Sequence, residues 1–160
     1  MVEAYSFAML AIRLVHFIGG VTWIGAMTYL GLVHLPSMKE KTGNTLTLRA
    51  VSRLTNLLII TTIPSLTAGA AMALILSGLN TDVLTASPWG LSIMAGGLIA
   101  LAALVMTFTV VLPCLEKLSA ENLQAHERDS LVARCQRWAR ITIILGILVL
   151  ATMAAAGTGI

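Results

Sequence analysis

Charged residues are scarce in this chain of 160 residues: Asp, Glu, Lys and Arg make up 11% of it, and aromatic residues make up 5%. Soluble domains carry about 25% charged residues. Hydrophobic residues reach 58%, and the mean hydropathy is +0.92. This scarcity of charge excludes an ordinary soluble domain. It predicts an integral membrane protein, whose helices satisfy their own backbone hydrogen bonds in lipid.

Paired carboxylates and a large basic excess are also missing, and each absence narrows the function. The net charge of +3 resides in loops, where basic residues set the orientation of a membrane protein. We therefore expect no nucleic-acid partner. The N-terminus has no basic segment ahead of its apolar run, so we expect no cleaved signal peptide. The loop carboxylates indicate a solvated helix face: Glu116, Glu121, Glu127 and Asp129.

Four apolar stretches are long enough to cross a bilayer, which needs about 20 helical residues per span. They cover residues 7–35, 54–79, 89–115 and 141–159. Residues 1–160 are therefore expected to form a single all-α domain, an integral membrane four-helix bundle. Small residues are dense in the last three stretches, and they allow helices to approach one another closely.

Prolines lie at two helix edges and at one interior position. Pro36 and Pro88 fall at the edges of apolar stretches, where proline is common. Pro64 lies inside the second stretch and should kink it. We expect neighbouring hydroxyl groups to bond the carbonyl oxygen that Pro64 leaves free: Thr61, Thr62 and Ser65.

Basic residues are distributed unevenly between the loops. Nine of the ten fall between the first and second stretches or between the third and fourth, whereas residues 80–87 contain none. Because loops rich in Lys and Arg stay in the cytoplasm, we predict that both termini lie on the outer side. The nine residues are Lys39, Lys41, Arg49, Arg53, Lys117, Arg128, Arg134, Arg137 and Arg140.

The segment over residues 119–140 is expected to be an amphipathic helix on the cytoplasmic side. Ser119 is its expected N-cap, and Trp138 its interfacial anchor. The segment either lies on the membrane surface or extends the fourth span. Cys114 and Cys135 face the same reducing compartment and form no CxxC pair, so we expect free thiols.

His16 is an ionisable residue within the first apolar stretch, one turn after Arg13. Ionisable groups inside a membrane are costly and usually serve a function. One interpretation is a packed seam between helices, with a hydrogen-bonded histidine and an arginine that extends to the membrane surface. Residues at spacings of three and four share one helix face. The stripe that contains this histidine comprises Met9, Arg13, His16, Gly20, Trp23 and Met27.

The other interpretation of His16 is a ligand site. At about 1.5 Å per helical residue, His16 lies on the order of 12 Å below the outer membrane boundary. Imidazole and thioether ligands suit the iron of haem b or Cu(I). No other histidine falls at this depth, so a bis-histidine haem is not expected there. One methionine from each of the other stretches is expected near this level: Met72, Met94 and Met153.

Two features favour haem over copper. Gly19 and Gly20 leave space beside His16 for a flat macrocycle. Arg13 lies one turn closer to the outer surface and can donate charge-assisted hydrogen bonds to propionates. Methionine, however, is also a common gap filler in cores. The expected cofactor-binding residues are His16, Arg13, Gly20 and Trp23, and the expected metal ligands are His16, Met94, Met72 and Met153.

The two other histidines are predicted to lie on the cytoplasmic side. His34 comes shortly before Pro36 at the end of the first stretch, and His126 lies in the long loop after the third. Loop histidines are ordinarily exposed. We therefore expect both side chains to be solvated or bonded to a backbone carbonyl.

Three runs of sequence resemble a known family. RLVHFIGGVTWIGAMTYLGLVHLP, from Arg13, resembles the first helix of small four-helix membrane proteins grouped around HemJ-type protoporphyrinogen oxidase and the CopD copper-resistance domain. RLTNLLIITTIPSLTAGAAMAL, from Arg53, and PWGLSIMAGG, from Pro88, resemble the second and third helices of HemJ-type proteins. The resemblance covers residues 7–105, and the last helix is only generically similar.

The resemblance implies a haem-associated four-helix bundle with His16 as the haem ligand. This chain lacks three polar residues of the HemJ-type pattern. They are a lysine where Met94 stands, an arginine near Gly31 and a histidine late in the third helix. These departures argue against protoporphyrinogen oxidation itself. The CopD resemblance rests mostly on the first helix and implies copper handling.

Three functions follow from these residues. The first is a haem b-binding membrane protein with a redox or electron-transfer role, or an oxidoreductase acting with a quinone or a porphyrin if the sixth iron position is open. The second is a copper-transport protein with a His/Met Cu(I) site. The third is a non-catalytic subunit of a respiratory membrane complex. The compact four-span form indicates a bacterial inner membrane, and we expect assembly as a homodimer or in a larger respiratory complex within the lipid bilayer.

Overall fold

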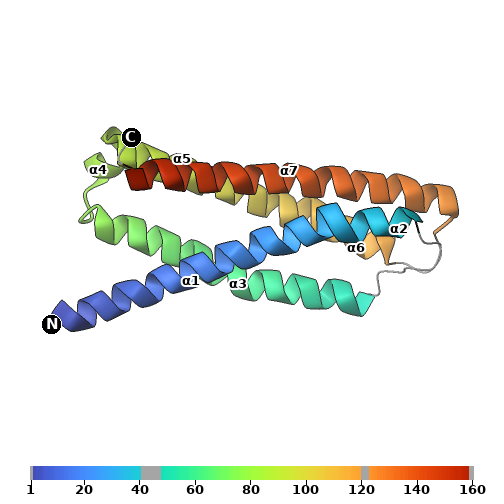
Figure 1. Cartoon of the computed structure of the whole chain (residues 1–160), viewed down its shortest axis with the longest axis horizontal. Helices are drawn as coiled ribbons and strands as arrows, with labels where there is room; N and C mark the ends of the chain where they lie inside the picture. The colour runs from blue at the N-terminus through green and yellow to red at the C-terminus, as the bar shows by residue number, and fades with distance from the viewer. Residues whose placement is uncertain (1, 41–47, 120–122, 159–160) are drawn as a thin grey trace.

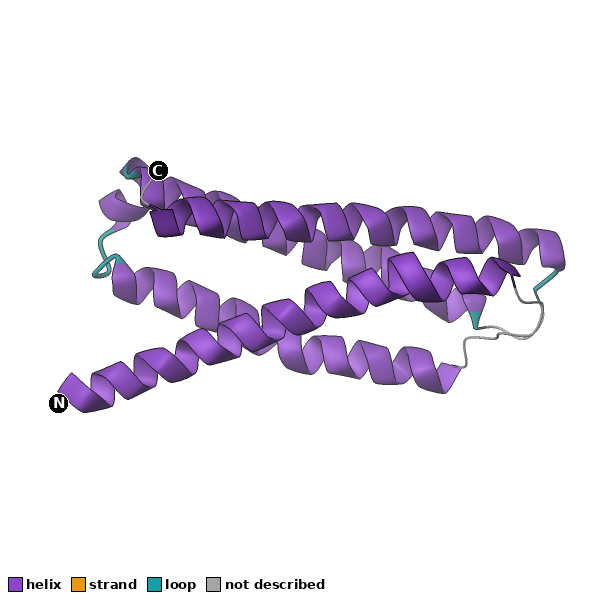
Figure 2. Cartoon of the chain, in the orientation of Figure 1, coloured by secondary structure: helices purple, strands orange, loops and turns teal. Residues whose placement is uncertain are grey.

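The computed structural model describes residues 2–40, 48–119 and 123–158, and every regular element in these ranges is a helix (Figure 2). Four helical segments are long and apolar enough to cross a membrane: Ser6–Met38, Arg49–Leu76, Pro88–Leu118 and His126–Gly157. The prediction of an all-α, multi-pass four-helix membrane bundle is therefore confirmed. Lys41 and Glu121, which entered the predictions on topology and charge, lie outside the described residues.

The first span is a continuous helical rod that contains a π-helical turn. It consists of α1 (Val2–Thr28), η1 (Tyr29–His34) and α2 (Leu35–Glu40). Pro36, expected at a helix edge, thus lies within the rod. It is the second residue after η1, where the hydrogen-bond pattern changes from i→i+5 to i→i+4, so its missing N–H falls at an existing irregularity.

The second span is α3 (Leu48–Leu76), with Pro64 in its interior. The hydroxyl groups near this proline do not bond the carbonyl that it leaves free, so that expectation is wrong. Thr61 donates to the Leu57 carbonyl of its own helix, and Ser65 donates across to α1. Hydroxyls in a helix commonly bond the carbonyl four residues earlier, and for Thr61 this carbonyl lies a turn away from the one that Pro64 leaves free.

The third span begins after the short helix α4 (Thr81–Ala86). It consists of α5 (Pro88–Met106), a second π-helical turn η2 (Thr107–Val111) and α6 (Leu112–Leu118). The Ser87 hydroxyl caps α5 by accepting a hydrogen bond from the backbone N–H of Gly90 at 3.0 Å. Pro88 at the first helical position suits this start, because that position needs no intrahelical N–H.

The fourth span is α7 (Ala125–Thr158), a single helix of 34 residues. At 1.5 Å per residue it is about 51 Å long, more than the hydrocarbon thickness of about 30 Å. The amphipathic segment therefore extends the fourth span and does not lie on the membrane as a separate helix. Ser119 is the C-cap of α6, where its hydroxyl donates to the Glu116 carbonyl, so its predicted role as an N-cap is wrong.

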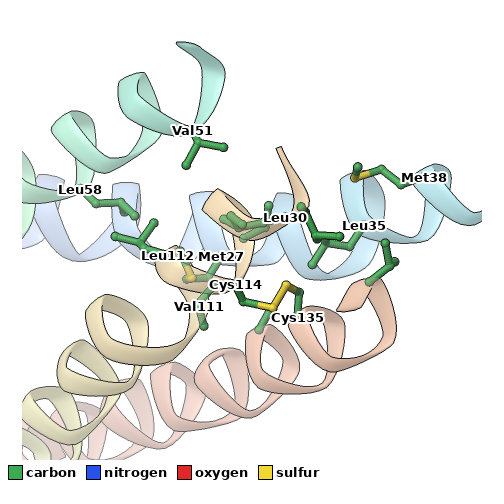
Figure 3. Close-up of a cluster of buried hydrophobic side chains, with 14 of the residues drawn as sticks. Met27, Leu30, Leu35, Met38, Val51, Leu58, Val111, Leu112, Cys114 and Cys135 are labelled. Carbon is green, nitrogen blue, oxygen red and sulfur yellow. A yellow bond between two sulfur atoms is a disulfide. The ribbon is translucent and has the colours of Figure 1, made fainter. Parts of the chain in front are cut away.

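The spans associate as two pairs, α1 on α3 and α5 on α7, as Figure 1 shows. Both termini and α4 lie at one end of the bundle, and α2, α6 and the beginning of α7 lie at the other. Large buried side chains fill the end near α2 and α6 (Figure 3), among them Met27, Leu30, Leu35, Val111 and Leu112. Toward the termini, α1 and α7 diverge (Figure 1).

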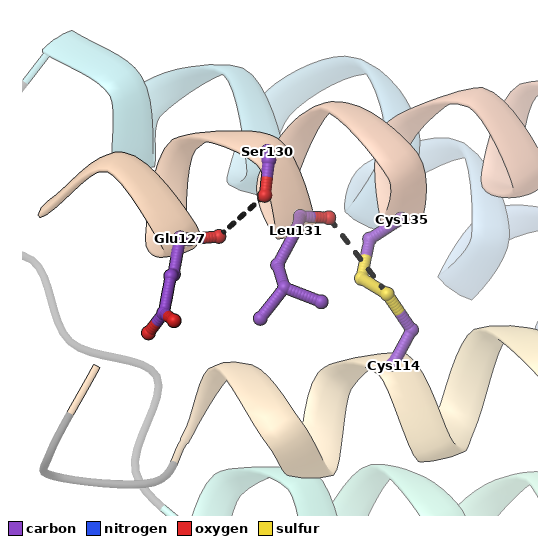
Figure 4. Close-up of a disulfide and its surroundings, with 5 residues drawn as sticks. All are labelled: Cys114, Glu127, Ser130, Leu131 and Cys135. Carbon is purple, nitrogen blue, oxygen red and sulfur yellow. Dashed lines mark hydrogen bonds between the residues drawn. A yellow bond between two sulfur atoms is a disulfide. The ribbon is translucent and has the colours of Figure 1, made fainter. Parts of the chain in front are cut away.

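Cys114 on α6 and Cys135 on α7 form a disulfide, with their Cα atoms 5.9 Å apart (Figure 4). The expectation of two free thiols is therefore wrong. The cysteines are separated by 21 residues in sequence, and the antiparallel packing of the third and fourth spans brings them to one level. Both are buried, so the bond joins these two spans within the core.

Candidate functional site

His16 lies where α1 crosses α3, and two hydrogen bonds join the helices at this point. Nδ1 of His16 is 2.8 Å from the carbonyl oxygen of Ser65, and Oγ of Ser65 donates to the carbonyl oxygen of His16 at 2.7 Å. Because a carbonyl oxygen only accepts, Nδ1 carries the proton, and the lone pair of the neutral ring is on Nε2. A metal-binding histidine has this arrangement, in which the second nitrogen fixes the ring.

Two glycines permit this close crossing. A Cβ on Gly69 would lie 2.7 Å from Cε1 and 2.8 Å from Nδ1 of His16, so only glycine leaves room for the ring. A Cβ on Gly19 would collide with Ser65 and with the Thr61 carbonyl. Gly19 therefore allows α1 and α3 to approach and does not leave space for a macrocycle. Gly20 does, because a Cβ there would meet no atom within 4 Å.

A cavity of about 140 Å³ lies beside His16, between the two helix pairs. All four spans line it, and its walls are almost entirely apolar. It opens on the lipid-facing surface between exposed rim residues, Phe17 and Val21 of α1 and Leu150 of α7. The cavity therefore communicates with the hydrocarbon interior of the membrane.

Two polar atoms in the residues that line this cavity lack hydrogen-bond partners within the described structure. They are Nε1 of Trp23 and Oγ1 of Thr62, in side chains that are 8% and 6% exposed. A buried donor without a partner costs about 1–3 kcal/mol, and such groups call for an explanation, which can be a bound ligand. The residues that line the cavity thus carry one free acceptor, on His16, and two unused donors.

The sequence did not identify Thr62 as a site residue. A signal for it was present, since Leu58, Thr62, Ser65 and Gly69 follow one another at spacings of three and four and therefore share one face of α3. The structure packs this face against α1. The sequence analysis assigned the Thr62 hydroxyl to the carbonyl that Pro64 leaves free. It therefore missed that Thr62 lines the same cavity as His16.

The structure brings together some of the predicted site residues and separates others. His16, Gly20, Trp23 and Met153 line the same cavity. Met94, which is 43% exposed, and the half-buried Met72 do not line it, and neither does the exposed Arg13. The packing of α5 explains Met94.

Gly96 on α5 faces α7 so closely that a Cβ there would collide with Oγ1 of Thr152. Met94 precedes Gly96 by two residues, which is a rotation of about 200° around the helix axis. The methionine therefore projects from the opposite side of α5, toward lipid. Its predicted depth says nothing about this rotation.

The remaining histidines lie away from the cavity. His34 is in η1, where its ring stacks on Tyr29 with centroids 5.9 Å apart, and its buried Nε2 has no partner among the described residues. The His34 side chain is only half-buried, so the expectation of a solvated or carbonyl-bonded histidine stays a prediction there, although its Nε2 is enclosed. His126 is exposed as expected. The described ranges contain no group of three or more His, Cys, Asp and Glu side chains that could hold a metal.

No protein-family model matches this chain, and no curated protein or solved structure is significantly similar to it. The fold and the site define a multi-pass membrane protein with a histidine-containing cavity open to lipid. Any function must therefore be inferred from this cavity and from the sequence resemblance.

Proposed function

We propose that this chain binds haem b through Nε2 of His16 and serves a redox role, most simply electron transfer, in the membrane. The hydrogen bond between Nδ1 of His16 and the Ser65 carbonyl carries the proposal, because it leaves Nε2 free as a ligand beside an apolar cavity. Met153 lines the same cavity, and a thioether is a known partner of imidazole on haem iron. The resemblance of residues 7–105 to HemJ-type proteins adds further support.

The ligand atoms of the site suit a haem, but its enclosed volume is small for one. The cavity encloses about 140 Å³, whereas pockets for drug-sized ligands enclose about 300–1,000 Å³. A haem at His16 therefore also requires the lipid-facing opening and the free space beside Gly20. The apolar rim residues Phe17 and Leu150 provide suitable surfaces there.

When bound, haem b supplies an iron centre that carries one electron at a time. The residues of this chain prepare its surroundings. The Ser65 carbonyl orients the imidazole and makes Nε2 a stronger donor, and the apolar walls exclude water. Arg13, exposed one turn from His16, is within the same helix face and suits a propionate.

The proposal includes an electron partner and a location. Because the cavity opens to lipid, a lipid-soluble quinone that reaches the bundle from the membrane interior is the proposed electron partner. The proposed location is a bacterial inner membrane with both termini outside, as the distribution of basic residues indicates. A homodimer or a larger respiratory complex is the proposed assembly.

The test is the absorption spectrum and pyridine haemochrome of protein purified from haem-replete cells. We expect a Soret band in the wild type, its loss in His16→Ala and its retention in His126→Ala, which alters an exposed histidine. Size-exclusion chromatography checks that each variant remains folded. A wild type without haem, or a folded His16→Ala variant with full haem content, would contradict the proposal.

Copper transport is the second candidate, and the small volume of the cavity favours it. A single Cu(I) ion fits within the enclosed volume, whereas a macrocycle would have to extend through the lipid-facing opening, and His16 and Met153 would supply one imidazole and one thioether. Metal analysis of the purified protein should then find copper and no haem. Met153→Leu should abolish copper binding, whereas Met94→Leu, outside the cavity, should preserve it.

A further inference from the structure

A second, shallow groove runs along the lipid-facing side of α5 and η2, away from the His16 cavity. Residues Leu98, Leu101, Ala102, Val105 and Thr109 line it at spacings of three and four, so they belong to one helix face. The small side chain of Ala102 lies among larger neighbours and deepens the groove. From Leu98 to Thr109 the groove is about 16 Å long, close to half of the hydrocarbon thickness of about 30 Å.

One end of the groove lies toward α6, and an aromatic residue and a cation are found there. Trp138 of α7 lines the groove there, and the exposed Arg134 lies four residues earlier on the same face of α7. Helical side chains lean toward the helix N-terminus. Trp138 therefore covers the turn that carries Arg134, and Arg134 extends toward the membrane surface.

The disulfide fixes the level of this arginine along the bundle. Cys135, the next residue after Arg134, is bonded to Cys114 in α6, and α6 begins directly after η2. Arg134 therefore lies just beyond the end of the groove, where the helices approach the membrane surface. The site therefore follows the parts of a phospholipid in sequence. The apolar groove matches the acyl chain, the tryptophan matches the interfacial region, and the arginine matches the head group.

We propose that the groove binds an acyl chain of an anionic phospholipid whose phosphate pairs with Arg134. Tryptophan is enriched at the level of lipid head groups, and basic pockets between transmembrane helices on the cytoplasmic side bind anionic head groups. The charge of Arg134 selects an anionic lipid over a neutral one. This site is independent of His16 and of the proposed haem.

Quenching of Trp138 fluorescence by lipids brominated on their acyl chains tests the proposal in reconstituted vesicles. The difference between wild type and Trp138→Phe isolates the signal of this residue. At equal mole fraction, brominated phosphatidylglycerol should quench Trp138 more than brominated phosphatidylcholine, with an apparent preference of about fivefold for one arginine–phosphate pair. Raising the salt concentration should reduce this preference.

Matched variants identify the groups responsible. Arg134→Gln should remove the preference and Arg134→Lys should retain it, while Arg49→Gln, an exposed arginine at the beginning of α3, should leave it unchanged. Ala102→Leu fills the groove and should lower quenching by both lipids. Equal quenching of the wild type by both lipids, or a preference that survives Arg134→Gln, would overturn the proposal. So would protection of Trp138 from both lipids in a cross-linked dimer, because a second copy would then occupy the groove.

Discussion

His16 and Ser65 exchange hydrogen bonds across the crossing of α1 and α3: the imidazole Nδ1–H donates to the Ser65 carbonyl, and the Ser65 hydroxyl donates to the His16 carbonyl. The two residues are 49 positions apart in sequence. This exchange holds the helices together and also decides which imidazole nitrogen keeps its lone pair free. Stability and ligand binding at this site can therefore be separated by substitution.

Ser65→Ala should lower stability and leave ligand binding intact. It removes the hydroxyl bond between helices, at a cost of about 1 kcal/mol, but it retains the backbone carbonyl that orients His16. Thermal unfolding in detergent measures the effect. Thr67→Ala is the control, because the exposed Thr67 hydroxyl bonds only within α3. Equal effects of the two substitutions would show that the bond between helices contributes nothing.

Gly69→Ala should displace the imidazole and impair the site. The new Cβ would lie within 2.8 Å of two ring atoms, and overpacking of this kind costs about 1–3 kcal/mol. We expect weaker haem or copper binding together with a lower unfolding temperature. Gly97→Ala places a methyl group in open space and should stabilise its helix by up to about 1 kcal/mol. A Gly69→Ala protein with wild-type ligand content would contradict the proposed position of the ring.

Thr62→Val tests whether the unpartnered hydroxyl is reserved for a ligand. Val has nearly the shape of Thr without the hydroxyl, so the change should stabilise the ligand-free protein by about 1 kcal/mol. In the ligand-bound protein the same substitution should stabilise less, or should destabilise, because the wild-type Thr62 hydroxyl then bonds the ligand and the variant loses that bond. Unfolding of both forms supplies the comparison. Destabilisation of the ligand-free form would indicate that Thr62 already has a partner.

The Cys114–Cys135 bond should be detected as a mass difference between samples alkylated with and without prior reduction. It closes a loop between residues 21 apart, so its removal by Cys114→Ala with Cys135→Ala should cost about 2 to 4 kcal/mol. In the reduced protein, the Cys114 thiol can donate to the Leu131 carbonyl, since these atoms are 3.7 Å apart (Figure 4). Full alkylation without reductant would contradict the bond.

The basic residues predict that the bundle end with α2 and α6 is cytoplasmic. The Cys114–Cys135 disulfide at that end favours the opposite orientation, since disulfides are rare in reducing compartments. In the cysteine-free double variant, Thr81→Cys on α4 and Ser130→Cys on α7 introduce single exposed thiols at opposite ends. An impermeant maleimide should label Thr81→Cys in spheroplasts and Ser130→Cys only after lysis. The reverse pattern would place the basic end and the disulfide outside.

The four spans and the unusual position of His16 were predictable from the sequence alone. Lipid requires about 20 helical residues per crossing, and an ionisable side chain within such a stretch stands out. Spacing along α1 also placed Gly20 and Trp23 with His16, because residues of one helix keep their angular relationship wherever the helix packs.

Which groups from other helices meet His16 depends on how the helices pack. Depth follows from position along a helix, but the direction of a side chain follows from the rotation that packing imposes. For this reason Met153 lines the cavity while Met94 faces lipid, and Ser65 rather than a methionine contacts the imidazole. The pairing of Cys114 with Cys135 was hidden for the same reason, because it depends on the register between two antiparallel helices.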